Sequence, residues 1–171
     1  MTMTSAKLSV EDRLLALEDR QAIYQVVCGY GYSVDGCNAA SVGDFYVEDG
    51  VYAVGDMPSW IGREAIADIT RDPGHLKLVG AGCAHMSTLP FVVIEGDRAI
   101  ATCHTMVPMH GENGFFIGRL SASRIELARQ ADGSWKIVHR QNNMLDGKPE
   151  GPTLLARLRE GPATNAGGGN V

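Results

Sequence analysis

The first part of the chain carries apolar residues at helical spacing, on one side only. Ser9 followed by Asp12 is typical of a helix start. Glycines between positions 29 and 36 weaken the far end, so we expect the helix to stop near Asp35. The apolar positions that define the stripe are Leu14, Leu15, Ile23, Val26, Val27, Tyr30 and Val34.

Shorter elements follow this helix. Asn38 can cap a second helix that runs through Phe45. Asp49-Gly50 is a turn signal, and the residues VYAV after it predict a short strand. Gly62 precedes a third helix, REAIADITRD, which Pro73-Gly74 is expected to end.

The second half of the chain changes from helical to strand-like patterning. Four long apolar runs are separated by short turns rich in glycine and aspartate, which favours an antiparallel meander. Helices first and strands afterwards predict an α+β fold, with helices packed on one face of a curved sheet. Residues 152–159 are expected to add a last helical turn. The four runs are residues 84–95, 98–110, 114–129 and 135–144.

The length of 171 residues and the hydrophobic fraction of 44% predict one domain with a real core. We place this domain at residues 10–150. Residues 1–9 are expected to be disordered, and residues 151–171 to form a C-terminal segment that is mostly disordered after 161 because it is rich in glycine.

Charge and composition exclude several classes of partner. The net charge is −5 and basic residues are scattered, which disfavours nucleic acid and anionic membrane surfaces. No apolar run is long enough to span a membrane, and the polar N-terminus indicates no signal peptide. Four cysteines without CxxC spacing indicate a cytoplasmic protein with reduced thiols.

Three residues stand out as candidates for proton transfer. Asp35, His85 and His110 each lie at the edge of an apolar element. An imidazole titrates near neutral pH, so small environmental shifts make it an acid or a base. The same three residues have the composition of a facial metal site, but no local motif such as HxD supports one. We therefore expect catalysis without a metal or a cofactor.

Five segments, in this order and at this spacing, resemble the SnoaL-like branch of the NTF2-like superfamily. The resemblance covers roughly residues 12–145 and implies a conical barrel, in which a strongly bent antiparallel sheet wraps around a pocket and the N-terminal helices cover one side. The segments are LEDRQAIYQVVCGYGYSVD (17–35), VGDFYVEDGVY (42–52), IGREAIADI (61–69), VVIEGDRAIATCH (92–104) and DGSWKIVHR (132–140).

Within this superfamily the candidate catalytic residues resemble those of scytalone dehydratase. Residues 104–110, HTMVPMH, keep the spacing of two histidines in that enzyme. The resemblance implies that Asp35, His85 and His110 are catalytic. A dehydrochlorinase of the superfamily uses the aspartate–histidine pair alone. One position departs from the pattern, because Val34 stands where scytalone dehydratase has a tyrosine that positions a water.

Four further residues are candidates for substrate contact: Tyr30, Tyr32, Trp60 and Arg124. Trp60 follows a flexible stretch, so it either caps the pocket mouth or packs on the third helix. Arg124 lies in the middle of a strand, where it either anchors an anionic group or, as we favour, pairs with a surface acid.

The remaining histidines are less informative. His104 shares strand parity with His110 and would line the same cavity, unless Pro108 marks a bulge that breaks the alternation. His139 is expected to be structural, and His75, next to Pro73-Gly74, to be solvated.

These features favour a cofactor-independent lyase that removes water, or another small leaving group, from a small, largely apolar aromatic or cyclic compound. His85, oriented by Asp35, would take a proton from carbon, and His110 would donate one or stabilise an enolate-like intermediate. The alternatives are an isomerase or polyketide-type cyclase in the same pocket, and a non-catalytic module that binds a small molecule.

Apolar residues on both faces of one strand predict self-association. Within residues 114–129 they occur at both parities, so one face would leave an exposed apolar patch. We expect a homo-oligomer built on this sheet. The resemblance to scytalone dehydratase favours a trimer, and the wider superfamily makes a dimer the alternative.

Overall fold

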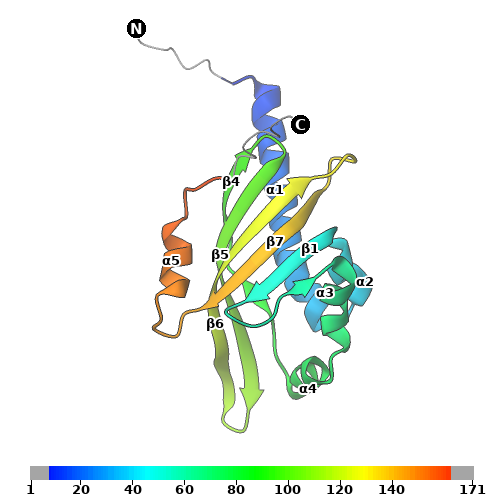
Figure 1. Ribbon diagram of the computed structural model, residues 1–171, viewed down its shortest axis with the longest axis vertical. Coiled ribbons are helices and arrows are strands. Elements are labelled where there is room, and N and C mark those ends of the chain that lie inside the picture. Colours follow the sequence, from blue (N-terminus) through cyan, green and yellow to red (C-terminus); the bar gives the residue numbers. More distant parts are fainter. Residues whose placement is uncertain (1–7, 163–171) are drawn as a thin grey trace, which may run out of the picture.

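The computed structural model describes residues 8–162 and consists of one curved, unclosed sheet with helices on both sides (Figure 1). The strand order is β2-β1-β7-β6-β5-β3, and β4 also pairs with β5. The strands are β1 (Tyr46–Val54), β2 (Trp60–Ile61), β3 (Met86–Ser87), β4 (Phe91–Glu95), β5 (Arg98–Gly111), β6 (Gly114–Arg129) and β7 (Trp135–Met144).

The α+β class is confirmed, and the strand runs after residue 90 pair antiparallel as predicted. The run at 84–95 is divided into β3 and β4. The expectation of a wholly antiparallel sheet was wrong, because β1 pairs with β7 in parallel and makes the sheet mixed. The turn predicted at Asp49-Gly50 was also wrong: these residues lie within β1, where the register shifts between Tyr46 and Val51.

The predicted helix starts are confirmed at two places. At the first, the Ser9 hydroxyl accepts a hydrogen bond from the Asp12 amide at 3.0 Å, and the Asp12 carboxylate accepts one from the Ser9 amide at 3.2 Å. At the second, the Asn38 side chain accepts from the Ser41 amide at 3.1 Å. The helices are α1 (Val10–Asp35), α2 (Ala39–Asp44), α3 (Arg63–Asp68), α4 (Pro73–Ala81) and α5 (Glu150–Ala156), with a 3₁₀ turn at Ile69–Arg71.

Helix α4 was missed because Pro73 was interpreted as a helix stop. In the structure Pro73 occupies the first turn, where a missing amide proton costs nothing. Asp72 caps this turn by accepting from the Gly74 amide at 2.8 Å and the His75 amide at 3.2 Å. The expectation that His75 is solvated was therefore wrong, since α4 carries its side chain into the protein, where it is 9% exposed.

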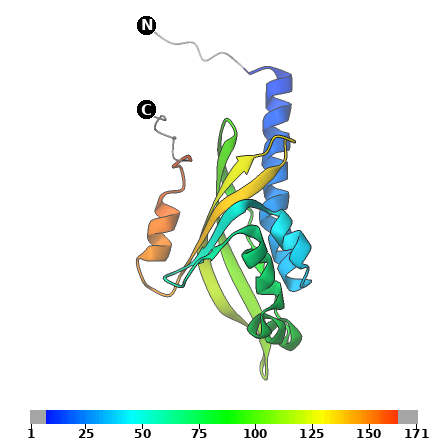
Figure 2. The same ribbon diagram turned by 45° about the vertical axis from the view of Figure 1, so that its right-hand side comes forward.

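The core lies between α1 and the sheet. The N-terminal part of α1 projects beyond the sheet, so Leu14 and Leu15 are exposed although they continue the apolar stripe (Figure 2). Burial along the helix begins at Ile23. Helix α5 covers the other face of the sheet (Figure 2). The core residues on the α1 side include Ile23, Val27, Val34, Tyr46, Ile66, Ile125, Leu127 and Ile137.

A group of charged and aromatic side chains fixes the first half of α1 to the sheet, far from Asp35 at the end of the helix. The Arg129 guanidinium donates to both oxygens of Asp19, at 2.6 and 2.7 Å, and lies 4.5 Å above the Trp135 ring. The Trp135 indole donates to Asp19 at 3.1 Å. The hydrogen bonds from Arg129 hold the pKa of Asp19 below its ordinary value, although partial burial acts in the opposite direction.

Two further expectations concern disorder at the chain ends and membrane-spanning helices. The predicted disorder of residues 1–9 and after 161 lies outside the described residues, except at residues 8, 9 and 162. Among residues 8–162, no helix is long and apolar enough to cross a membrane.

Asp19→Asn is expected to lower the free energy of unfolding by about 1–3 kcal/mol at pH 7, because it breaks charged hydrogen bonds to Arg129. The contribution of Asp19 is present at neutral pH and is lost as pH falls through its lowered pKa, so the difference from wild type should shrink in acid. Urea unfolding across this pH range measures both effects.

Asp97→Asn is the matched control. Asp97 also accepts from Arg129, at 2.9 Å, but its side chain is 80% exposed, so its loss should cost less than about 1 kcal/mol. Equal costs for the two variants would show that the Asp19 contact is not what holds α1 in place.

Candidate functional site

The last turn of α1 touches the segment that precedes β3. Gly31 and Asp35 are one helical turn apart and therefore share a face of the helix. A Cβ atom at Gly31 would overlap the carbonyl oxygen of His85, so only glycine allows this approach. The close contact at Gly31 brings the side chain of Asp35 to the same residue, His85.

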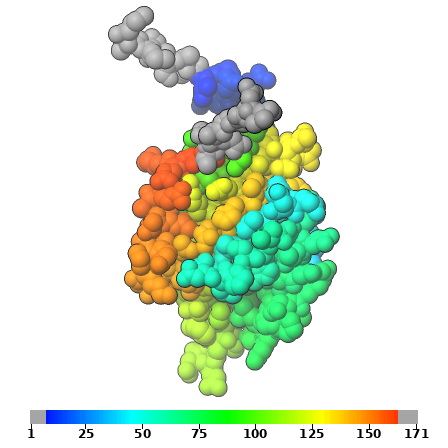
Figure 3. Space-filling model, in the orientation of Figure 1, coloured from blue at the N-terminus to red at the C-terminus, as the bar shows by residue number. Residues whose placement is uncertain are grey.

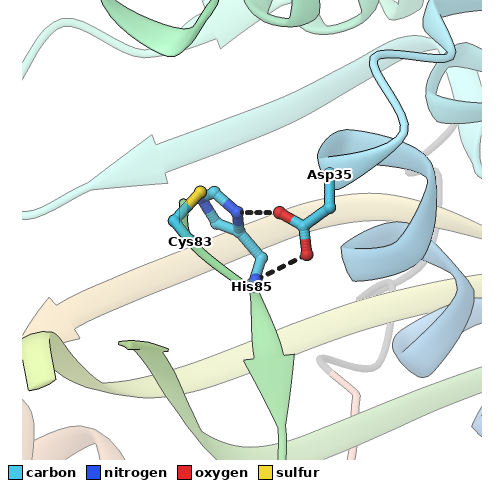
Figure 4. A group of neighbouring side chains, drawn as sticks. All are labelled: Asp35, Cys83 and His85. Atoms are coloured by element: carbon cyan, nitrogen blue, oxygen red, sulfur yellow. Dashed lines mark hydrogen bonds and ion pairs between the residues drawn. The ribbon is translucent and has the colours of Figure 1, made fainter. Parts of the chain in front are cut away.

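Asp35 and His85 form two hydrogen bonds (Figure 4). The Asp35 Oδ1 atom lies 2.6 Å from Nδ1 of the imidazole, and Oδ2 accepts from the His85 backbone amide at 2.7 Å. These contacts place Asp35 where the expectation that it orients His85 requires. Because a carboxylate only accepts hydrogen bonds, the proton of a neutral ring is on Nδ1, and Nε2 keeps the lone pair of a base. We call this pair the dyad.

The neighbouring strand holds the segment that carries His85. Gly82, with a φ of 98°, ends α4, and Cys83 then pairs with Met109 of β5. The Gly82 carbonyl accepts from the His110 amide at 2.8 Å, and the Ala84 amide donates to the Pro108 carbonyl at 3.1 Å. The backbone of His85 is thus fixed from both sides, by α1 and by β5.

The environment keeps His85 neutral. Burial lowers the pKa of His85 below its ordinary value and outweighs the hydrogen bond to Asp35, which acts in the opposite direction. The charge of Arg119 adds to the lowering. At pH 7 the imidazole is therefore able to accept a proton.

A small cavity adjoins the dyad, and we call it the dyad cavity. Its volume of about 20 Å³ is room for one water-sized group. Larger surface hollows of about 410 and 660 Å³ include neither dyad residue. The lining residues of the dyad cavity are Tyr30, Gly31, Tyr52, His85, Met86, Ser87, Thr105, Met106, Val107, Arg119, Arg140 and Asn142.

Arg140 is the most unusual member of this lining. Its side chain is buried, and its guanidinium lies 4.4 Å above the Tyr30 ring and 5.6 Å from the Tyr52 ring. Its Nε atom donates to Asn142 at 3.5 Å, and Asn142 in turn donates to the Tyr52 hydroxyl at 3.1 Å. A full positive charge therefore sits inside the protein, next to the dyad.

Of the four residues predicted to contact substrate, only Tyr30 lines the dyad cavity. Tyr32 is 80% exposed on α1. Trp60 stacks on Tyr52 at 5.5 Å but lies in a different surface hollow. Arg124 donates at 3.1 Å to the carbonyls of Arg157 and Glu160, so it ties down the segment after α5 instead of pairing with a surface acid.

The other histidines take different positions. His110 is exposed at the end of β5, with its ring 5.2 Å from Phe115, and does not line the dyad cavity. His104 is also exposed and lies outside it. His75 is buried: its Nε2 donates to the Val34 carbonyl at 3.0 Å, and its ring lies 5.8 Å from His85. The structure thus unites Asp35 with His85 but not with His110.

Sequence alternation missed Arg140 because β7 contains a bulge. Leu127 of β6 pairs with Ile137, but Glu126 pairs with His139, which leaves Val138 as an extra residue. The inward face therefore passes from Ile137 to Arg140 instead of to His139. The sequence signal that could have pointed to it is an arginine within the strand-like run at 135–144.

Asp35, Cys83 and His85 are the candidate metal ligands among the described residues, with one atom from each within 4.8 Å of the others. Their arrangement suits proton transfer better. Asp35 is already bonded to Nδ1 of His85, and burial together with Asp35 raises the pKa of Cys83, which disfavours the thiolate that a metal needs. That the site works without metal stays a prediction.

Comparisons with known proteins agree with this architecture. A SnoaL-like domain family matches residues 15–141. An NTF2-like protein with a cystatin-like fold from Novosphingobium aromaticivorans is 36% identical, with a TM-score of 0.84 over 89% of this chain and 99% of that one. No curated protein matches the chain significantly.

A second solved structure is similar in fold alone. Hexachlorocyclohexane dehydrochlorinase LinA-type3 from Novosphingobium barchaimii is 17% identical, with a TM-score of 0.67 over 78% of this chain and 90% of that one. The family match covers most of the chain, and the helices and mixed sheet fit it. The chain therefore belongs to the SnoaL-like family within the NTF2-like superfamily.

Proposed function

We propose that the protein is a cofactor-independent lyase acting on a small aromatic or cyclic compound. His85 removes a proton from carbon through Nε2, and Asp35 holds the ring and stabilises the imidazolium that forms. The electron pair of the C–H bond becomes the new double bond, and the leaving group departs with the electrons of its own bond. Water, formed when the departing hydroxide takes up a proton, is the leaving group we favour, with halide as the variant.

The observation that carries this proposal is the dyad itself. Its carboxylate accepts two hydrogen bonds from one histidine, and that histidine has a lowered pKa beside a cavity. Perturbed titratable groups next to a cavity are typical of catalytic sites. The fold-level likeness to a dehydrochlorinase, which by its name performs an elimination, is an analogy in the same direction.

His110 is the proposed proton donor at the rim of the site. Its backbone amide donates to the carbonyl of Gly82, three residues before the dyad histidine. Its side chain is exposed, so it would act on a leaving group that extends out of the dyad cavity.

Two alternatives use the same residues differently. An isomerase or cyclase would return the proton to another atom of the substrate instead of losing a group. A binding module would need the cavity but not the base. Mass spectrometry of hydroxylated and halogenated aromatic compounds after incubation separates the three, because only a lyase changes the mass by the lost group.

Asp35→Asn and His85→Gln are each expected to lower kcat/KM by about 10²–10⁴, because each removes base catalysis without removing the cavity. The substrate is the compound that the mass-spectrometric screen identifies. His104→Gln is the matched control, since it alters an exposed histidine outside the cavity, and it should keep wild-type turnover. Turnover that survives in Asp35→Asn with unchanged ligand binding would support the binding module.

The kcat/KM of the wild type should rise with pH and level off, with a midpoint below about 6.5, because the base must be neutral and the pKa of His85 is lowered. Asp35 raises that pKa, so Asp35→Asn should move the midpoint of its residual activity further into acid. A midpoint above 7 in the wild type, or a shift toward alkaline pH in the variant, contradicts the assignment of His85.

We also propose that the protein is a homo-oligomer, with a trimer favoured over a dimer. The β5–β6 hairpin projects from the body of the molecule (yellow-green in Figure 3) and carries Phe115, Phe116 and Ile117, all more than half exposed. Leu120 is partly exposed, whereas Ile125 and Leu127 of the same strand belong to the core. A second copy would remove this apolar group from water.

Light scattering at micromolar concentration should give two or three times the single-chain mass of 18.3 kDa. Phe116→Ser should shift the protein toward the monomer, since it removes an aromatic anchor from the projecting hairpin. Leu14→Ser, in the free part of α1, is the control and should leave the mass unchanged. A wild-type mass equal to one chain refutes the oligomer.

A further inference from the structure

We propose that the ligand of the dyad cavity carries an anionic oxygen, as a carboxylate or a phenolate does, and that Arg140 and Arg119 bind it. This inference rests on the proposed function, because it names the substrate class of the same site. It replaces the expectation of a largely apolar substrate with that of an organic anion whose body alone is apolar.

Arg140 lacks an anionic partner. Its side chain is only 3% exposed, and its Nη1 atom makes no hydrogen bond within residues 8–162. A buried cation is strongly unfavourable unless it is paired, so such a group is expected to have a counterion in the working state. Nη1 is the free donor that an incoming oxygen would accept from.

The neighbouring tyrosines do not supply that counterion. Tyr30 and Tyr52 present ring faces to the guanidinium, which attracts a cation without accepting its hydrogen bonds, and Tyr46 brings a buried hydroxyl close to it. Burial raises the pKa of Tyr30 and Tyr46 above the ordinary value, so both stay neutral phenols near pH 7. The charge of Arg140 is thus held in place but not neutralised.

Arg119 adds a second cation to the same cavity. It comes from β6, is half-buried, and forms no ion pair with the described residues. Its charge reaches the dyad, since it contributes to the lowered pKa of His85. The carboxylate at this site, Asp35, is already bonded through both oxygens to His85. The cavity therefore has an excess of positive charge.

The size of the cavity limits what can enter. A volume of about 20 Å³ accepts one oxygen-sized group but not a phosphate. The rest of the ligand would extend past Met86 and Met106, whose flexible apolar side chains suit a hydrocarbon body. An organic anion with one oxygen between the two arginines meets both requirements.

Calorimetric titration with benzoate and with benzamide tests the inference, because the two probes share a shape and differ in charge. The wild type should bind benzoate at least about tenfold more tightly, as expected for hydrogen bonds between charged groups. In a second arm, 4-nitrophenol should bind in its yellow, ionised form, with its pKa lowered by the site. Whichever of benzoate and 4-nitrophenolate binds more tightly indicates whether the natural group is a carboxylate or a phenolate.

Arg140→Met and Arg119→Met should each lose most of this preference. Arg140→Met should also melt no lower than the wild type, because it removes an unpaired buried charge. Arg119 is half-buried, so its variant keeps the test valid if Arg140→Met does not fold. Arg98→Met is the control: that arginine lies at the start of β5, near Glu126, and its loss should leave the preference intact.

Three results would each overturn the inference. The first is equal affinity for benzoate and benzamide, and the second is no binding of benzoate or 4-nitrophenolate at millimolar concentration. The third is a preference for benzoate that survives in both arginine variants. Asp35→Asn separates it from the proposed lyase function. That variant should lose turnover and still prefer benzoate. Retained turnover there would refute the dyad mechanism alone.

Discussion

The close approach of α1 to the backbone of His85 is the constraint on which the site depends. Gly31 leaves room for the His85 carbonyl, and the same helical face then delivers Asp35 one turn later. The carboxylate binds both the ring and the amide of one residue, so it fixes the position of the backbone and the tautomer of the side chain together. The contact between Gly31 and the His85 carbonyl therefore sets the position of α1 relative to His85.

Two arginines of adjacent strands show how differently the sheet uses charge. Arg129 of β6 is bonded to Asp19 and Asp97, and it ties α1 to the sheet as an element of stability. Arg140 of β7 is buried deeper and lacks any such partner in residues 8–162. Stability alone does not explain a buried cation of this kind, and its location beside His85 places it where a ligand would be.

Local rules predicted much of the fold. The helix start at Ser9, its end at Asp35 and the antiparallel order of the later strands follow from capping and periodicity. The parallel β1–β7 pairing is a long-range contact that periodicity does not encode. Gly31 was interpreted as a weak point of the helix, since a sequence does not reveal what lies opposite a glycine. The pairing of Asp35 with His85 was predicted by family resemblance and not by spacing.

The bulge at Val138 determines that Arg140, and not His139, lies on the inner face of β7. If the bulge lay beyond Arg140 instead of before it, His139 would replace Arg140 at the cavity, and an imidazole would stand in place of a guanidinium. In this sheet, the charge that lines the cavity therefore depends on strand register as well as on amino-acid sequence.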